Sequence, residues 1–227
     1  RLLTPIRVIA ATATILCAIW HTGAIASTAT ACNPPEIKTQ TDYSTPWVEY
    51  VDVATLNKRH QHRGSGLWLG STTNQLKTSV IASVNQQNQS SECPEAEILV
   101  MLSLAKHDVS LASELKGLSC LHKEVAQHEQ QHVSANRKAL EDMKPLVEKE
   151  LNDSIIEFSK THKKTSSFQT RLAKYLNTEM APKIQIMWND KGKIHEKIDS
   201  KEEYKRILTT CKDDAIKMNE ILTLKGL

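Results

Sequence analysis

The pattern of hydrophobic and polar positions changes half-way along the chain. In the first half, residues 47–53 are rich in β-branched and aromatic side chains, and residues 76–84 alternate between apolar and polar, as half-buried strands do. The apolar run 98–104 fits a buried strand or a short helix, and 109–115 predicts an edge strand that ends at Gly117. We therefore expect a small sheet, antiparallel in its pairing, in the N-terminal half.

The second half has the apolar period of helices. Such a period predicts one helix over residues 120–158, although Pro145 should end it, kink it or start a second helix. A further helix is expected over 168–188. Residues 200–203 form a capping box, which predicts a last helix that ends near Leu222. Strands followed by long helices indicate the α+β class.

The N-terminus has the features of a secretory signal peptide. Two arginines precede the apolar run 8–20, and small residues follow, so that cleavage is expected after Ala26 or Ala31. The run is shorter than the roughly 20 apolar residues that span a membrane. The alternative is an uncleaved N-terminal anchor. The signal peptide predicts export, to the bacterial periplasm or out of the cell.

Polar segments divide the rest of the chain. Residues 33–45 are expected to form a leader, 57–66 a basic loop and 159–166 a basic linker. The sequence therefore predicts three parts: a signal peptide over 1–31, an α+β domain over 32–160 and a helical C-terminal extension over 161–227.

Composition and charge exclude some partners. The chain has 227 residues, 40% of them hydrophobic, which suffices for a real core. Its formal charge is +3, but without the first 31 residues 27 basic residues face 26 acidic ones. A nearly neutral protein with 4% aromatic residues offers neither the charge nor the stacking surfaces that nucleic acids need. We expect no nucleic-acid partner.

The cysteines also suit an exported protein. Cys17 would leave with the signal peptide, and an even number remains: Cys32, Cys93, Cys120 and Cys211. Two disulfides are expected, with three possible pairings. Pairing Cys93 with Cys120 and Cys32 with Cys211 closes the shortest loop between ordered segments. Alternatively Cys32, which follows a weak match to a bacterial lipoprotein box, bears a lipid that tethers the protein to a membrane.

One motif indicates chemistry. Residues 128–132 read HEQQH, inside the predicted helix 120–158. Histidines four positions apart lie on one helix face, so His128 and His132 can bind one Zn²⁺ ion. Glu129 is turned by about 100° from His128, where it can take a proton from a metal-bound water and pass it to the leaving amine of a peptide. The alternative is a solvated helix face with two surface histidines.

The sequence leaves the third metal ligand open. A metzincin motif is excluded, because Ala135 and Lys138 occupy the positions of its glycine and third histidine. If Pro145 starts a helix that folds back, a glutamate of that helix completes the site, and we choose Glu148. If the helix continues straight through Pro145, none of its later glutamates can reach His128 and His132. The residues that stay open besides Glu148 are Glu150, Glu157, His107, Glu114 and His162.

The HEQQH motif on a helix after a short strand resembles the zincin metallopeptidases. More narrowly, residues 93–140 resemble uncharacterised families of secreted bacterial proteins that are predicted Zn-dependent proteases. The resemblance implies a zincin-like active-site helix, with His128 and His132 as ligands and Glu129 as general base. The resulting hypothesis is an exported zinc metalloprotease that hydrolyses a peptide or protein substrate. The alternative is a non-catalytic envelope protein that binds a partner through its helices and has a degenerate or structural metal site.

Overall fold

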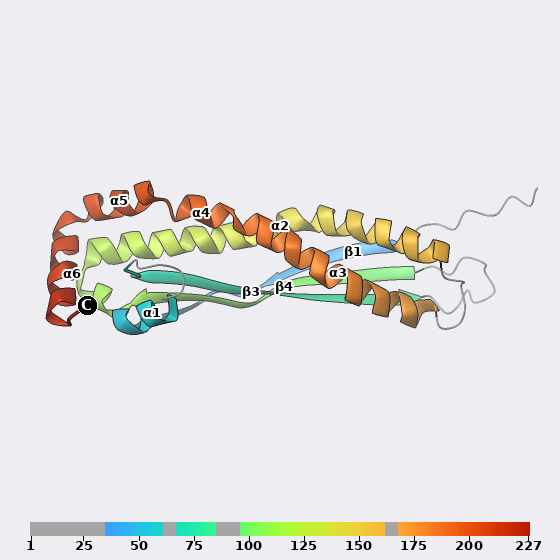
Figure 1. Cartoon of the computed structure of the whole chain (residues 1–227), viewed down its shortest axis with the longest axis horizontal. Coiled ribbons are helices and arrows are strands. Elements are labelled where there is room, and N and C mark those ends of the chain that lie inside the picture. Colours follow the sequence, from blue (N-terminus) through green and yellow to red (C-terminus); the bar gives the residue numbers. More distant parts are fainter. Residues whose placement is uncertain (1–34, 61–66, 85–95, 162–167) are drawn as a thin grey trace, which may run out of the picture. The chain divides into compact units, whose positions relative to one another are not determined.

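The computed structural model of the chain describes residues 35–60, 67–84, 96–161 and 168–227 (Figure 1). All of them belong to one unit, Asn33–Leu227. The predicted signal peptide, Cys32, Cys93 and His162 lie outside the described residues.

Strand β4 (Ala96–Ala112) organises the sheet, because it pairs with all three other strands. β1 (Glu36–Tyr43) runs parallel to its first half and β2 (Trp47–Val51) parallel to its second half, whereas β3 (Gly70–Val84) pairs antiparallel along its length. With long helices after the sheet, the α+β class is confirmed. The sheet itself is mixed and not antiparallel.

Three predictions for the first half were wrong in detail. The expected leader 33–45 contains β1. Its side chains are mostly polar and gave no strand pattern, but backbone pairing with β4 stabilises the strand. The expected loop 57–66 begins inside helix α1 (Val53–His60). The expected edge strand 109–115 is mostly the end of β4. Polar residues precede it, but β4 runs through them and pairs with β3 on both sides of a register shift between Gln75 and Leu76. His107, in this stretch, is 2% exposed.

The helices follow the predicted order. Ser200 begins α5 as predicted, because its side-chain oxygen accepts a hydrogen bond from the Glu203 backbone N–H at 3.2 Å. The expected last helix is divided at Cys211. No helix in the described part of the chain is long and apolar enough to cross a membrane. The helical elements are η3 (Ser113–Gly117), α2 (Ser119–Thr161), α3 (Phe168–Gly192), α4 (Ile194–Ile198), α5 (Lys201–Thr210) and α6 (Lys212–Leu224).

Helix α2 is continuous through Pro145. Proline removes one backbone donor, and so it leaves the carbonyl of Glu141 without its helical partner. Both residues are exposed, and water can therefore satisfy that carbonyl. This continuity determines which residues can reach the HEQQH motif.

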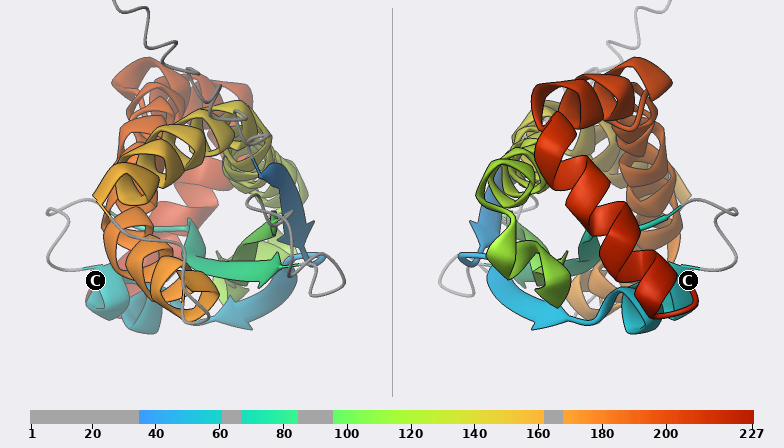
Figure 2. Two further views of the ribbon diagram at one scale, coloured as in Figure 1. Left: turned by 90° about the vertical axis from the view of Figure 1, so that its right-hand side faces the viewer. Right: turned by 90° about the vertical axis from the view of Figure 1, so that its left-hand side faces the viewer.

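Two hydrophobic clusters hold the helices on the sheet. One joins β3 and β4 to the C-terminal half of α2 and to α3, and the other joins the end of β4 to the start of α2, α5 and α6. Figures 1 and 2 show α3 beside the end of α2 and α6 across its beginning. The segment 161–227, expected as an extension, therefore contributes to both cores: its buried residues include Leu172, Leu176, Met180, Ile184, Ile207, Met218 and Leu222.

A disulfide joins Cys120 at the start of α2 to Cys211 between α5 and α6. One disulfide is therefore confirmed. Of the three possible pairings, the one that joins Cys93 to Cys120 and Cys32 to Cys211 is wrong. A short loop favoured Cys93 as the partner of Cys120, whereas packing brings together residues 91 positions apart. Asp214 strengthens the same junction, since its carboxylate accepts hydrogen bonds from the backbone N–H groups of Cys120 and Leu121 at 2.8 and 3.2 Å.

Replacing both cysteines, in a Cys120→Ala/Cys211→Ala variant, should lower the free energy of unfolding by about 2–4 kcal/mol, because the disulfide restricts the unfolded chain. Urea denaturation under oxidising conditions measures the change. Thr210→Ala, at an exposed neighbour, is the control and should stay within about 0.5 kcal/mol of the native protein. Equal stability of the double variant and the control would contradict the pairing.

Candidate metal centre

The face of α2 that turns inward is polar over two helical turns. His128, Glu129, His132 and Asn136 are 3%, 4%, 7% and 1% exposed. The alternative of a solvated face with surface histidines is therefore wrong. Buried polar groups need partners, and neighbouring segments supply most of them.

Asp199 completes a group of three ligand atoms with the two histidines of the motif. It lies between α4 and α5, directly before Ser200. Its Oδ1 is 3.1 Å from Nε2 of His128 and 3.0 Å from Nε2 of His132, and the two nitrogens are 3.2 Å apart. The three atoms thus form a nearly equilateral triangle.

This triangle fits zinc. Ligand bonds of about 2.0–2.1 Å in a tetrahedral site place neighbouring ligand atoms about 3.3–3.4 Å apart, only slightly more than the three separations here. Two imidazoles and one carboxylate are also the ligand types that zinc accepts. The Asp199 side chain is 37% exposed, so solvent reaches one side of the group.

Sequence reasoning missed Asp199 and chose Glu148. Because α2 is continuous, Glu148 is about 24 Å from His132 along the helix axis and does not reach the group. Asp199 is 67 positions from His132, and no spacing rule connects them. The one local signal was the capping box at Ser200, which marked the start of a helix beside Asp199 but assigned Asp199 no role.

The other open candidates also have different partners. His107 is buried next to Asn136: Nε2 of His107 is 3.5 Å from Nδ2 of Asn136. Glu114 accepts a hydrogen bond from the Val53 backbone N–H at 3.2 Å. Glu150 pairs with Lys183 on α3. None of these residues belongs to the His128–His132–Asp199 group.

The group favours an ionised Asp199. Burial raises the pKa of Asp199, but the neighbouring His128 and His132 rings outweigh it and leave the pKa well below its usual range. Burial lowers the pKa of His128, but the bond to Asp199 and nearby carboxylates raise it overall. The Tyr204 hydroxyl donates to Oδ1 of Asp199 at 2.9 Å; burial and this bond raise the pKa of Tyr204, so it remains a donor.

The side chain of Glu129 extends from α2 toward β3. Its Oε2 accepts a hydrogen bond from the Thr72 hydroxyl at 2.8 Å. Burial raises the pKa of Glu129, although Thr72 and the two histidines of the motif act in the opposite direction. Gly70 makes room for the carboxylate, since a Cβ there would lie 2.5 Å from Oε1 and 2.8 Å from a Val125 methyl. A carboxylate of raised pKa holds a proton more readily, as a general base must.

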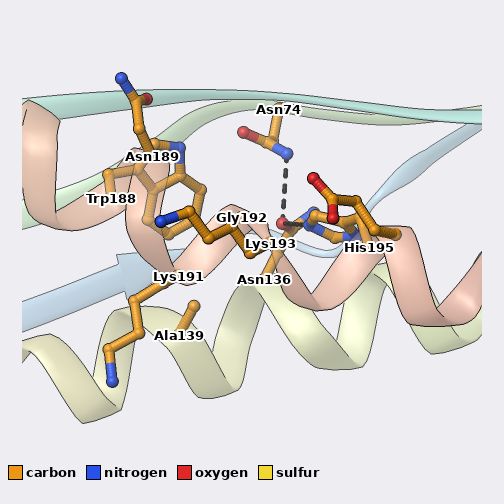
Figure 3. A pocket seen from close by; sticks show the side chains of 10 residues that line it. Asn74, Asn136, Ala139, Trp188, Asn189, Lys191, Gly192, Lys193 and His195 are labelled. Atoms are coloured by element: carbon orange, nitrogen blue, oxygen red, sulfur yellow. Dashed lines mark hydrogen bonds between the residues drawn. The ribbon is translucent and has the colours of Figure 1, made fainter.

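A cavity of about 450 Å³ lies beside the group, at the end of α3 (Figure 3). Asn136 and His195 form its wall nearest the ligands, and Trp188 lies on the opposite side in Figure 3. The other lining residues are Asn74, Ala139, Asn189, Lys191, Gly192, Lys193 and Glu196. Amides, an indole ring and charges of both signs line this cavity.

No protein-family model, curated protein or solved structure matches this chain. The resemblance of the HEQQH stretch to zincins therefore stays a prediction.

Gly70→Ala should destabilise the protein by about 1–3 kcal/mol, because the added methyl group overlaps the Glu129 carboxylate and Val125. Thermal or urea unfolding measures the loss. Gly117→Ala is the matched control: a Cβ there meets no atom within 4 Å, so stability should be unchanged or rise by up to about 1 kcal/mol. Equal effects would show that Glu129 does not pack against β3.

Proposed function

We propose that the protein is an exported zinc-dependent peptidase. His128, His132 and Asp199 are its metal ligands, and Glu129 is its general base. The observation that supports this best is the triangle of Nε2, Nε2 and Oδ1 atoms, with sides of 3.0–3.2 Å, next to a buried glutamate that is not part of it.

Zinc would supply Lewis acidity, which activates water near neutral pH and polarises a carbonyl group. The chain supplies the proton transfers. Glu129 takes a proton from the attacking water as the oxygen adds to the peptide carbonyl carbon, and gives it to the nitrogen when the C–N bond breaks. The Thr72 hydroxyl orients the carboxylate, and burial raises its pKa toward working pH.

The number of ligands supports catalysis over a structural metal site. Structural zinc sites have four protein ligands, whereas catalytic sites have three and an open position. Among the residues that the structure describes the group has three members, and one side of Asp199 faces solvent. The cavity beside His195 is large enough for part of a peptide, and we place the substrate there.

Export is part of the same proposal. A disulfide between Cys120 and Cys211 is typical of proteins in oxidising compartments such as the periplasm or the cell exterior. It agrees with the signal peptide expected over 1–31, which lies outside the described residues.

Metal content tests the ligand set. The purified protein should bind about one zinc per chain, and Asp199→Ala or His132→Ala should weaken binding by at least about 100-fold, since each removes one of three ligands. Competition with a chromophoric chelator measures affinity. Glu148→Ala is the control and should bind zinc normally. Loss of zinc in Glu148→Ala, with retention in Asp199→Ala, would contradict the assignment.

Glu129→Gln tests catalysis separately from metal binding. It should retain zinc and lower kcat for peptide hydrolysis by about 10²–10⁴-fold, because the amide cannot accept the proton from water. A fluorescence-quenched peptide library measures the rate. If the zinc-loaded native protein cleaves no member, the peptidase proposal fails and a non-catalytic metal protein remains. If Glu129→Gln cleaves equally fast, Glu129 is not the general base.

A further inference from the structure

The second ring nitrogen of His132 faces a chain of hydrogen-bonding groups. Nδ1 of His132 is 2.7 Å from Nδ1 of His195 on α4. Nε2 of His195 is 2.9 Å from Oδ1 of Asn136, which lies one helical turn after His132 on α2. The Asn74 amide on β3 donates to the same oxygen at 3.1 Å. Figure 3 shows this oxygen between Asn74 and His195.

The direction of these hydrogen bonds follows from the groups themselves. An amide oxygen can only accept, so Nε2 of His195 must donate to Oδ1 of Asn136. A neutral His195 then has a lone pair on Nδ1, which accepts from Nδ1–H of His132. A neutral His132 consequently has its single basic lone pair on Nε2, the atom that faces His128 and Asp199.

This direction matters because another tautomer is available. Nε2 of His132 is 3.0 Å from Oδ1 of Asp199, and a proton on that nitrogen would form a hydrogen bond with the carboxylate. That proton would occupy the side of the ring that a metal needs. In histidine ligands the bond made by one ring nitrogen selects the atom left for the metal.

A single short segment supplies both the third ligand and this support. His195 lies one helical turn before Asp199, and the Asp199 backbone N–H donates a hydrogen bond to the His195 carbonyl at 2.8 Å. Asn136 is held from its other side by Asn74, so the acceptor for His195 has a fixed position. The side chains of His195 and Asn136 also line the cavity.

We propose that His195, fixed by Asn136, is a positioning residue that holds His132 in the tautomer with a free Nε2 lone pair. The inference rests on the proposed zinc site for its purpose, but the hydrogen-bond direction itself does not require metal.

Two measurements on the purified chain test it. Long-range ¹H–¹⁵N NMR spectra, recorded above the ordinary histidine pKa of about 6.5, report which ring nitrogen of His132 bears the proton. Chelator competition gives zinc affinity for His195→Leu, which removes the acceptor, and for His195→Asn, whose Oδ1 restores an acceptor near the position of Nδ1. Lys197→Ala, at an exposed site on the same helix, is the control.

We expect Nδ1–H on His132 in the native protein and a shift toward Nε2–H in His195→Leu. Zinc affinity should fall by about 10–100-fold in His195→Leu and recover most of that loss in His195→Asn, with Lys197→Ala unchanged. Native His132 with its proton on Nε2 would overturn the inference without any variant. So would an unchanged tautomer and affinity in folded His195→Leu.

The failure of the proposed function looks different. A native protein that binds no zinc, but has Nδ1–H on His132 that depends on His195, refutes the metal site and leaves the hydrogen-bond chain standing. Zinc binding that does not change in His195→Leu supports the metal site and refutes the positioning role of His195.

Discussion

The burial of polar side chains on one face of α2 is the constraint on which the site depends. His128, Glu129, His132 and Asn136 are all nearly inaccessible to solvent. Burying such groups costs several kcal/mol each unless they are paired, so partners must come from other segments. β3 supplies Thr72 and Asn74, and the α4–α5 segment supplies His195 and Asp199, each in a definite position.

The rest of the fold places these partners. One hydrophobic cluster fixes the C-terminal half of α2 and α3 on the sheet, and the other fixes the start of α2, α5 and α6. The α4–α5 segment lies between these two anchors, and the Cys120–Cys211 disulfide closes its far end. Gly70 admits the Glu129 carboxylate against β3, where a larger residue would displace it.

The proposed chemistry assigns separate tasks to neighbouring residues. Two histidines and Asp199 converge on one point, whereas Glu129 is held apart from them by Thr72 and is available as a base. His132 receives a second contact through its other ring nitrogen. Such outer contacts set the orientation and tautomer of ligands, and their loss weakens metal sites even when every ligand is present. The cavity next to His195 lies against the same wall.

The sequence by itself determined the α+β class, the strand over 76–84, the Ser200 cap and the helix that bears His128, Glu129 and His132. Each depends on periodicity or capping within a few residues, which local physics decides. Only the tertiary structure decided that Asp199, and not Glu148, joins the histidines, and that Cys120 pairs with Cys211. These contacts join segments more than sixty positions apart, and they exist because apolar clusters bring the C-terminal helices back onto α2.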